Sequence, residues 1–445
     1  MSHPTEDEIE QYASHPSGVA KREEIEAHLA ACPICSASLM FIRSLEAGLR
    51  DPDVWDIAER DVSPTRASIH DFAARLAAED EEAEQLLQNL LQNPARTALM
   101  NLATRRRFLT VGVVRRLLRA ASEACDREPL EALTFADTAI DVGEHLIGYP
   151  STVIHELRAH GWKERANALA ALGQYDASLD SLDHAEREFS QAPGSPLGRA
   201  IVQHGRAIVR YYRGEFASAI ELLSESAAIY ASLGETDRYM RVRHWLANAM
   251  FGRSDIRGAR EIYEELLAWG ESENDLAWVA RESNTLGRCA YELGDLSSAV
   301  QYFHQSIQSF RELGMAAEAL RPEWGFALVV LGSGKPGEAL ARLHDVREDF
   351  RRRQMLGDEA LVSLDMMDAL HELGRDREIV ALGSEIIVSF TRAGMLTSAL
   401  TAFAYLKEAA ARGSAIPQAI QHVRQFITRL QREPALLFCP PEKNL

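Results

Sequence analysis

Small and aromatic residues recur along most of this chain with a period of forty residues. Each period carries a short polar phrase, GQYDAS at residue 173, with counterparts that begin at residues 214, 254, 294, 334 and 374. A glycine (serine at 254) ends one helix there, and a small residue begins the next helix at Ser178, Ala219, Ala259, Ala299 and Ala339. An aromatic side chain follows near the end of each second helix: Phe189, Tyr230, Trp269, Phe310, Phe350 and Phe390. Because this spacing is typical of packing between close helices, the pattern predicts an all-α chain of repeated helix pairs.

Residues 120–412 resemble the tetratricopeptide repeat (TPR). The positions that follow its spacing of small and large residues most closely are Trp162, Ala166, Gly173, Tyr175, Leu182 and Ala185. The period here is longer than the usual one of that family, which is about 34 residues, so both helices of each pair are expected to be longer. The resemblance implies a right-handed α-solenoid whose first helices line a concave face that binds peptides or proteins and performs no chemistry.

The chain is accordingly divided into four parts. Residues 1–50 form a small helical metal-binding domain, and residues 51–120 a linker and helical bridge. Residues 121–412 form the repeat array, with roughly forty residues in each unit, and residues 413–445 a C-terminal capping helix and tail.

Metal-ligand spacing appears near the start, in HLAACPICSASL at residues 28–39. Cys32 and Cys35 stand at C-x2-C spacing and His28 lies one helical turn before Cys32, an arrangement that ligates zinc in many small domains. A closed structural site needs a fourth ligand, and the upstream histidines are His3 and His15. The alternative is that the two cysteines are buried small residues and His28 a surface residue.

Residues 3–39 are similar to the zinc-binding anti-sigma domain of bacterial regulators. That resemblance implies a ligand set of His3, His28, Cys32 and Cys35, with His15 as the spare, and a sigma factor as partner. Four protein ligands leave no open position for a reactive water, so Zn²⁺ would be structural.

An apolar stripe follows the cysteines, in SASLMFIRSLEAGLR at residues 36–50. The side chains predicted to face a partner are Leu39, Phe41, Ile42, Leu45 and Leu49. Packing of this stripe within its own domain is an equal alternative.

The TPR register also predicts which side chains of the first helices face the groove. The predicted partner-binding residues are Lys163, Asn167, Arg241, His244, Asn248, Arg281, Asn284, Arg288, Tyr291, Arg321 and Trp324. Asp365 and Asp368 reverse the sign of the charge in the last unit. This cationic strip is unexpected in a chain of net charge −18 and predicts an acidic ligand, either a peptide segment of a partner or the chain's own N-terminal residues 1–27. The alternative is a solvated helix face.

Composition narrows the function classes. The net charge disfavours direct nucleic-acid binding. No apolar stretch is long enough to span a membrane, and the N-terminus lacks the layout of a secretory signal, so a cytoplasmic location is expected. Five cysteines, three of them widely scattered, argue against a disulfide framework. Phosphate-loop, G-x-S-x-G, HExxH and kinase motifs are absent from the sequence, which argues against an enzyme.

Two functional hypotheses follow. The first is an anti-sigma-like transcription regulator, in which the zinc domain sequesters a sigma factor and the array senses a protein partner. The alternative is a TPR scaffold or adaptor in a signalling or defence complex, with the zinc domain only structural or docking.

Overall fold

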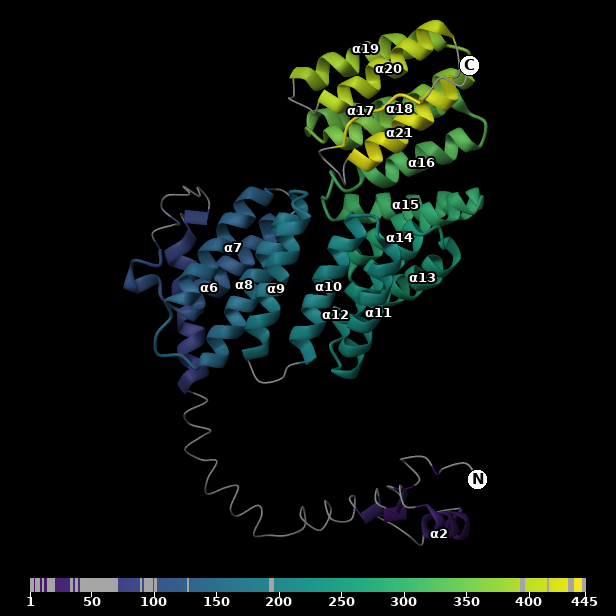
Figure 1. The fold of residues 1–445 in the computed structure, drawn as a ribbon. Helices are drawn as coiled ribbons and strands as arrows, with labels where there is room; N and C mark the ends of the chain where they lie inside the picture. Colours follow the sequence, from purple (N-terminus) through teal and green to yellow (C-terminus); the bar gives the residue numbers. More distant parts are fainter. Residues whose placement is uncertain are drawn as a thin grey trace. The chain divides into compact units, whose positions relative to one another are not determined.

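The computed structural model describes residues 4, 9, 12–13, 21–32, 35–36, 39–40, 71–88, 90–91, 99, 102–125, 128–191, 196–392, 397–413, 416–430 and 436–441. The chain divides into two compact units, Met1–Glu82 and Ala83–Leu445. Over the described residues the secondary structure is helical, without a strand (Figure 1).

The first unit has a small core of its own around helix α2 (Arg22–Ala31). Its buried side chains are Ile9, Tyr12, Ile25, Cys35 and Leu39. The Tyr12 hydroxyl donates to the Glu26 carboxylate at 3.0 Å, and the Arg22 guanidinium donates to the same carboxylate at 2.8 Å. These bonds lower the pKa of Glu26, with the bond from Arg22 as the main cause.

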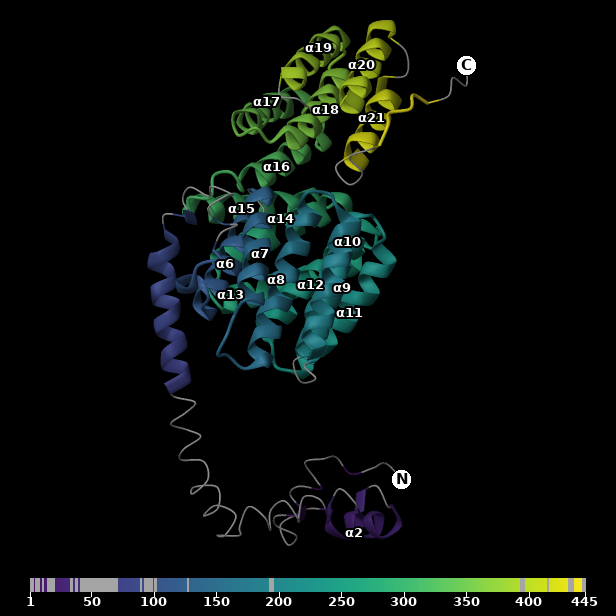
Figure 2. The same ribbon diagram turned by 60° about the vertical axis from the view of Figure 1, so that its left-hand side comes forward.

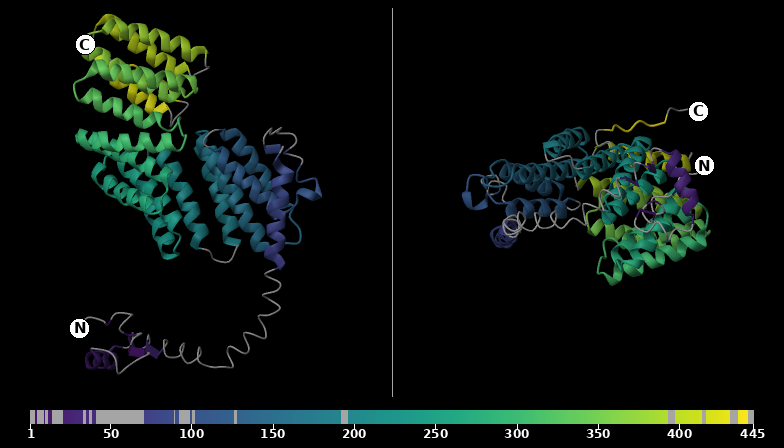
Figure 3. Two further views of the ribbon diagram at one scale, coloured as in Figure 1. Left: turned by 180° about the vertical axis from the view of Figure 1, so that it is seen from behind. Right: turned by 90° about the horizontal axis from the view of Figure 1, so that it is seen from below.

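The second unit is a succession of antiparallel helices. They are α6 (Val111–Ala124), α7 (Pro129–Glu144), α8 (Ser151–Ala171), α9 (Tyr175–Gln191), α10 (Pro196–Tyr212), α11 (Phe216–Ser232), α12 (Thr236–Gly252), α13 (Ile256–Ser272), α14 (Leu276–Glu292), α15 (Leu296–Glu312), α16 (Leu320–Gly332), α17 (Pro336–Arg352), α18 (Leu356–Glu372), α19 (Asp376–Arg392), α20 (Thr397–Arg412) and α21 (Ile416–Leu430). Each helix packs on the next, and the helix axes rotate along the array (Figures 1 and 3).

The forty-residue period arises from helix length. Helices such as α11, α13 and α15 each contain 17 residues. Short turns of three residues join most helices between α9 and α19, so that two helices and two turns complete one period. The largest departure is at α16, which begins only at Leu320. Pro322 explains the late start, because proline lacks a backbone N–H and is tolerated in the first turn of a helix but not further inside.

The turns recur every twenty residues, and each contains one residue with positive φ. Glycine supplies it at Gly294 (φ 78°), whereas Gln354 adopts it with φ 58°. Leu293 and Gly294 close the end of α14 with N–H bonds to the Cys289 and Tyr291 carbonyls. A side chain in this left-handed region costs about 1–2 kcal/mol, a cost that glycine avoids.

Exchanging the residue type at these two turns is therefore expected to shift stability in opposite directions. A Cβ added at Gly294 would meet no atom within 4 Å, so Gly294→Ala tests backbone conformation alone and should cost about 1 kcal/mol. Gln354→Gly should raise stability by about 0.5 kcal/mol. Glycine removes the cost of positive φ in the folded state, but it also increases the conformational entropy of the unfolded chain, which offsets part of the gain. Thermal unfolding midpoints measure both, and shifts in the same direction would contradict the explanation.

The predicted core of the array is confirmed. The small positions Ala219, Ala259, Ala299 and Ala339 are fully buried, and so are the side chains of Phe350 and Phe390. Ser178 occupies the small position of the first unit, where its hydroxyl donates to the Ala166 carbonyl at 2.7 Å. The hydrogen bond allows a polar side chain to be buried between two helices.

The C-terminal end of the array departs from the simple succession. Helix α20 packs on α19, and α21 packs on both α20 and α18 (Figure 2). Arg424 of α21 thereby reaches α18, where it pairs with Asp365 at 2.5 Å and with Asp368. The two acidic residues at which the predicted groove charge changes sign, Asp365 and Asp368, are thus paired with a cation of the same chain.

No helix among the described residues is both long and apolar enough to cross a membrane.

Candidate functional site

The first unit brings three predicted metal ligands together. Helix α2 carries His28, and Cys32 follows it in extended conformation. The Cys32 N–H donates to the His28 carbonyl at 2.8 Å. The donor atoms of His28, Cys32 and Cys35 all lie within 4.8 Å of one another. Ligands of one tetrahedral zinc lie about 3.5–4 Å apart, so small side-chain shifts would complete the geometry. Burial raises the pKa of the Cys35 thiol, and the neighbouring Cys32 adds to the effect.

The donor set of one nitrogen and two sulfurs fits zinc and lacks one ligand of a closed shell. The predicted fourth ligand, His3, lies outside the described residues. The same holds for Phe41, Ile42, Leu45 and Leu49 of the predicted partner-binding stripe. Leu39 supports the alternative of packing within the domain, because its side chain is only 9% exposed and belongs to the core of the first unit.

We expect one zinc per chain, lost when Cys32 and Cys35 are both replaced by serine. The hydroxyl of serine is a poor zinc ligand, since zinc favours thiolate and imidazole. Elemental analysis of the purified protein measures this, with Cys439→Ser as a control at an exposed cysteine. Equal zinc in the double variant and the wild type would remove these cysteines from the ligand set.

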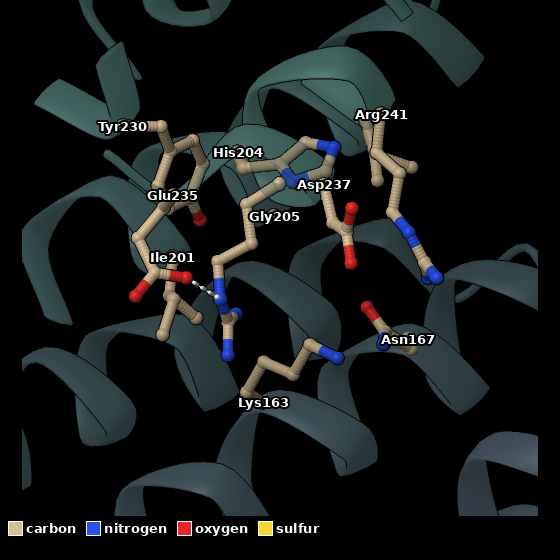
Figure 4. A pocket seen from close by; sticks show the side chains of 11 residues that line it. Lys163, Asn167, Ile201, His204, Gly205, Tyr230, Glu235, Asp237 and Arg241 are labelled. Carbon is tan, nitrogen blue, oxygen red and sulfur yellow. Dashed lines mark ion pairs between the residues drawn. The ribbon is translucent and has the colours of Figure 1, made fainter. Parts of the chain in front are cut away.

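The array contains two adjoining cavities, lined mainly by the first helices of the pairs, from α8 to α16. The smaller, of about 500 Å³, is lined by Lys163, Asn167, Ile201, His204, Gly205, Ile208, Tyr230, Glu235, Asp237, Arg238 and Arg241. In Figure 4 the side chains of Lys163, Asn167 and Arg241 point toward the same space as the Asp237 carboxylate. First helices therefore line the groove, as the TPR resemblance implied.

Two cations of the smaller cavity have partners and one does not. Lys163 pairs with Glu164 at 2.7 Å, and Arg238 pairs with Glu235 at 3.2 Å. Asn167 donates to Glu164 at 3.0 Å. Arg241 forms no ion pair with any residue that the structure describes.

His204 lies at the junction, because it lines both cavities. Burial lowers its pKa to about 3, and the nearby cations Lys163, Arg238 and Arg241 act in the same direction. The imidazole is therefore neutral at pH 7. Its Nε2 is buried and has no hydrogen-bond partner among the described residues.

The larger cavity, of about 1280 Å³, continues the smaller one toward the C-terminus. Its lining is His204, Tyr212, Arg241, His244, Trp245, Asp275, Trp278, Arg281, Glu282, Met315, Ala317, Glu318, Arg321, Arg353, Gln354 and Met355. The two cavities share His204 and Arg241, and we call them together the cationic groove.

Two of the three carboxylates that line the larger cavity, Glu282 and Asp275, are engaged by neighbouring groups, whereas Glu318 forms no ion pair within the described part of the chain. Glu282 is fully buried and accepts from His244 at 2.7 Å, while Asp275 caps α14 by accepting from the Trp278 N–H at 2.9 Å. Arg321 lies 3.6 Å from Asp358. Arg281 and Arg353, by contrast, form no ion pair within the described part of the chain.

Several predicted groove residues do not line either cavity. Asn248 accepts from the Tyr263 hydroxyl at 2.7 Å, and the Arg288 guanidinium lies 4.8 Å from the centre of the Phe251 ring. Trp324 donates to Asp365 at 2.6 Å. The two remaining residues are Asn284, whose Oδ1 is buried, and Tyr291, which packs against the core and whose pKa burial raises.

For the residues of α12 and α14, the reason is axial position along the helix. Arg241 and Asn248 share a face of α12, but seven residues separate them by about 10 Å along the axis. The cavities lie near the start of α12 and α14, beside the turns at residues 315–318 and 353–355. Residues in the second half of these helices contact neighbouring helices instead.

The sequence prediction also missed residues of the cavities. Tyr212, Trp245, Trp278, Met315 and Met355 give the larger cavity an apolar part, and Arg238 and Arg353 add positive charge. The repeat could have indicated Arg353, because the turn at 353–355 lies forty residues after the turn at 313–315. Both turns follow a second helix and border the same cavity.

Comparisons with known proteins place the fold. No family model matches the chain, and no curated protein matches it. Among solved structures it is similar to aspartyl phosphate phosphatase F from Bacillus subtilis, with a TM-score of 0.50 and 12% identity over 87% of this chain and 95% of that one. It is also similar to a Rap protein complexed with Competence and Sporulation Factor, with a TM-score of 0.49 and 14% identity over 81% of this chain and 99% of that one. A further neighbour is the apo form of the quorum sensor NprR from B. thuringiensis, with a TM-score of 0.47 and 12% identity over 77% of this chain and 99% of that one.

The array is a TPR-like α-solenoid. At such identities the likeness concerns the fold alone. The resemblance of the N-terminal residues to the anti-sigma domain gains no support from these comparisons and stays a prediction.

Proposed function

We propose that this protein is a regulatory adaptor whose TPR-like array binds an acidic segment of a protein partner in the cationic groove. The observation that supports this most strongly is the set of Arg241, Arg281 and Arg353, which line the groove without an ion pair to any described residue. Converging arginines repel one another and are unusual in a chain of net charge −18. A ligand with several carboxylates relieves the repulsion and gains charge-assisted hydrogen bonds.

The size of the groove favours an extended polypeptide segment over a small molecule. Small-molecule pockets have volumes of about 300–1,000 Å³, and the larger cavity alone exceeds that range at about 1280 Å³. Its lining comes from α10, α12, α14 and α16 and from the turns between helices, so a bound segment would contact several repeats. We propose a binding role and no catalytic one.

Fluorescence anisotropy with a labelled hexaglutamate peptide tests the proposal on the full chain. The peptide should bind at 50 mM salt and weaken strongly at 500 mM, because screening shortens the range of exposed charge interactions. A hexaglutamine peptide is the matched control and should not bind. Equal affinity for both peptides, or no affinity for hexaglutamate at low salt, would contradict the proposal.

The resemblance of residues 3–39 to the zinc-binding anti-sigma domain motivates a second candidate function for the first unit, sequestration of a sigma factor, and the cluster of His28, Cys32 and Cys35 fits the zinc site that this function needs. The zinc-loaded full chain should then bind a sigma factor encoded by the same organism and reduce transcription from its promoter. If the zinc-loaded protein leaves transcription unchanged for every sigma factor of that organism, the first unit is structural or docking. The adaptor role of the array does not depend on this result.

A further inference from the structure

The larger cavity combines positive charge with an apolar wall. Trp245 of α12 and Trp278 of α14 form one part of its lining, and Met315 and Met355 come from the turns. The arginines therefore share the lining of one cavity with large apolar side chains. Tryptophan, tyrosine and arginine are the residues that carry most of the binding energy in protein interfaces, and methionine adapts to varied partners.

The two tryptophans differ in whether the indole N–H forms a hydrogen bond. The Trp278 indole N–H donates to the Leu266 carbonyl at 3.0 Å, and the ring meets Trp269 edge to face with centres 5.1 Å apart. These contacts hold the Trp278 ring in place in the cavity lining. Trp245 is half-buried, and its ring contacts Tyr211 at 5.4 Å between centres. Its indole N–H makes no hydrogen bond to a residue in the described ranges.

The smaller cavity has a different chemistry. Its polar lining is Lys163, Asn167, Arg238 and Arg241, with Asp237 and Glu235 opposite. Among the described residues, no tryptophan or methionine lines it. Two contrasting cavities therefore meet at Arg241 and at the neutral His204, whose buried Nε2 has no partner in the described part of the chain.

We propose that the cationic groove is a bipartite site that selects acidic segments carrying a large apolar side chain. The apolar side chain lies against Trp245, Trp278 and Met315, while carboxylates on either side contact Arg241, Arg281 and Arg353. The ligand backbone passes between the two cavities beside His204, which lines both of them. This inference rests on the proposed function and adds to it the feature that distinguishes one acidic partner from another.

Three labelled peptides of equal length test the bipartite site on the full chain. The first is GEEAEEG, the second replaces its alanine by phenylalanine, and the third keeps the phenylalanine but replaces glutamate by glutamine. The phenylalanine peptide should bind at least tenfold more tightly than the alanine peptide at the same salt concentration, because a buried aromatic side chain adds apolar contact without changing charge. The glutamine peptide should bind weakly or not at all.

Two variants assign the preference to the cavity. Trp245→Leu keeps an apolar side chain of substantial volume but removes the ring and its N–H, and Met315→Gln changes a turn residue at nearly constant length. Each should reduce the advantage of phenylalanine over alanine to less than threefold, measured as the ratio of the two affinities within the same variant. Circular dichroism confirms that both variants retain the helical array.

The outcomes separate this inference from the proposed function. Equal affinity for the alanine and phenylalanine peptides would overturn the bipartite site but leave acidic-segment binding in place. An undiminished phenylalanine advantage in both variants would also overturn it, since the apolar contact would then lie elsewhere. Failure of every glutamate peptide to bind would overturn the proposed function itself.

Discussion

Replacing Arg241 and Arg281 together by glutamate is expected to weaken binding of hexaglutamate at least a hundredfold. Both residues line the larger cavity, and neither forms an ion pair to a described residue, so their charge is available to a ligand. Each substitution removes one charge-assisted contact, worth about 1.5–3 kcal/mol, and introduces repulsion in its place. A factor of one hundred corresponds to about 2.8 kcal/mol, which is a low estimate for two such changes.

The control has the same change in net charge at positions outside the groove. Arg257 of α13 and Arg377 of α19 are exposed, and neither lines the cavities. Arg257→Glu with Arg377→Glu should therefore alter the affinity less than fivefold at 150 mM salt, where exposed charges beyond about 8 Å are screened. Comparable losses in both double variants would mean that overall charge, and not the groove, governs binding.

Arg424→Ala is expected to destabilise the C-terminal end of the array by about 3 kcal/mol at pH 8, because it leaves buried carboxylates without their cation. Asp365 is only 5% exposed and is bonded to Arg424 at 2.5 Å and to the Trp324 indole at 2.6 Å. Asp368, which is more exposed, pairs with the same guanidinium. One arginine thus joins α21 to α18.

The loss should be smaller at pH 5. Burial raises the pKa of Asp365, and it raises the pKa of Asp368 to about 6, while Arg424 opposes both shifts. Carboxyl groups whose pKa is higher in the folded state than its unfolded value of about 3.9 stabilise the fold less as the pH rises through that window. Without Arg424 both pKa values rise further, so that at pH 5 the carboxyls are protonated and need no cation.

Hydrogen exchange of α18 and α21 measures this locally, which suits a repeat array whose unfolding is not all-or-none. Arg412→Ala is the control, because its pair with Glu408 is exposed and contributes about 0.5 kcal/mol or less. An equal effect of Arg424→Ala at pH 5 and pH 8 would show that the arginine acts through packing and not through charge.

The array could be predicted from the sequence because its signal is local. Turn glycines and small residues such as Ala219 and Ala259 repeat with helix length, and the aromatic Phe350 and Phe390 pack where the period places them. The half-period of twenty residues was not predicted, because Asn274 and Gln354 replace glycine at two of the intervening turns, which still adopt positive φ.

The site was predicted only in part, since its geometry depends on contacts between distant residues. Arg241, His244, Arg281 and Arg321 converge on one cavity, as the forty-residue spacing predicted. Arg288 instead covers the Phe251 ring on the preceding first helix. Pairing of that kind depends on axial offsets between packed helices, which a repeat period does not specify.

Arg424 illustrates the same limit over a longer range. It lies 59 residues from Asp365 in the sequence, and only the packing of α21 on α18 brings the two together. For the first unit, the spacing of His28, Cys32 and Cys35 did predict their convergence, because a helical turn and a short loop connect them.

Site-specific photo-cross-linking of the full chain in cells tests most directly whether the groove holds an acidic partner segment. A photoreactive amino acid replaces Met315, which lines the larger cavity, and in a matched variant it replaces Glu261, an exposed residue of α13 outside both cavities. We predict that the Met315 probe captures a partner through a segment rich in aspartate and glutamate, and that the Glu261 probe does not. Capture of the same partner by the Glu261 probe alone, or capture at Met315 through a segment without acidic residues, would contradict the proposal.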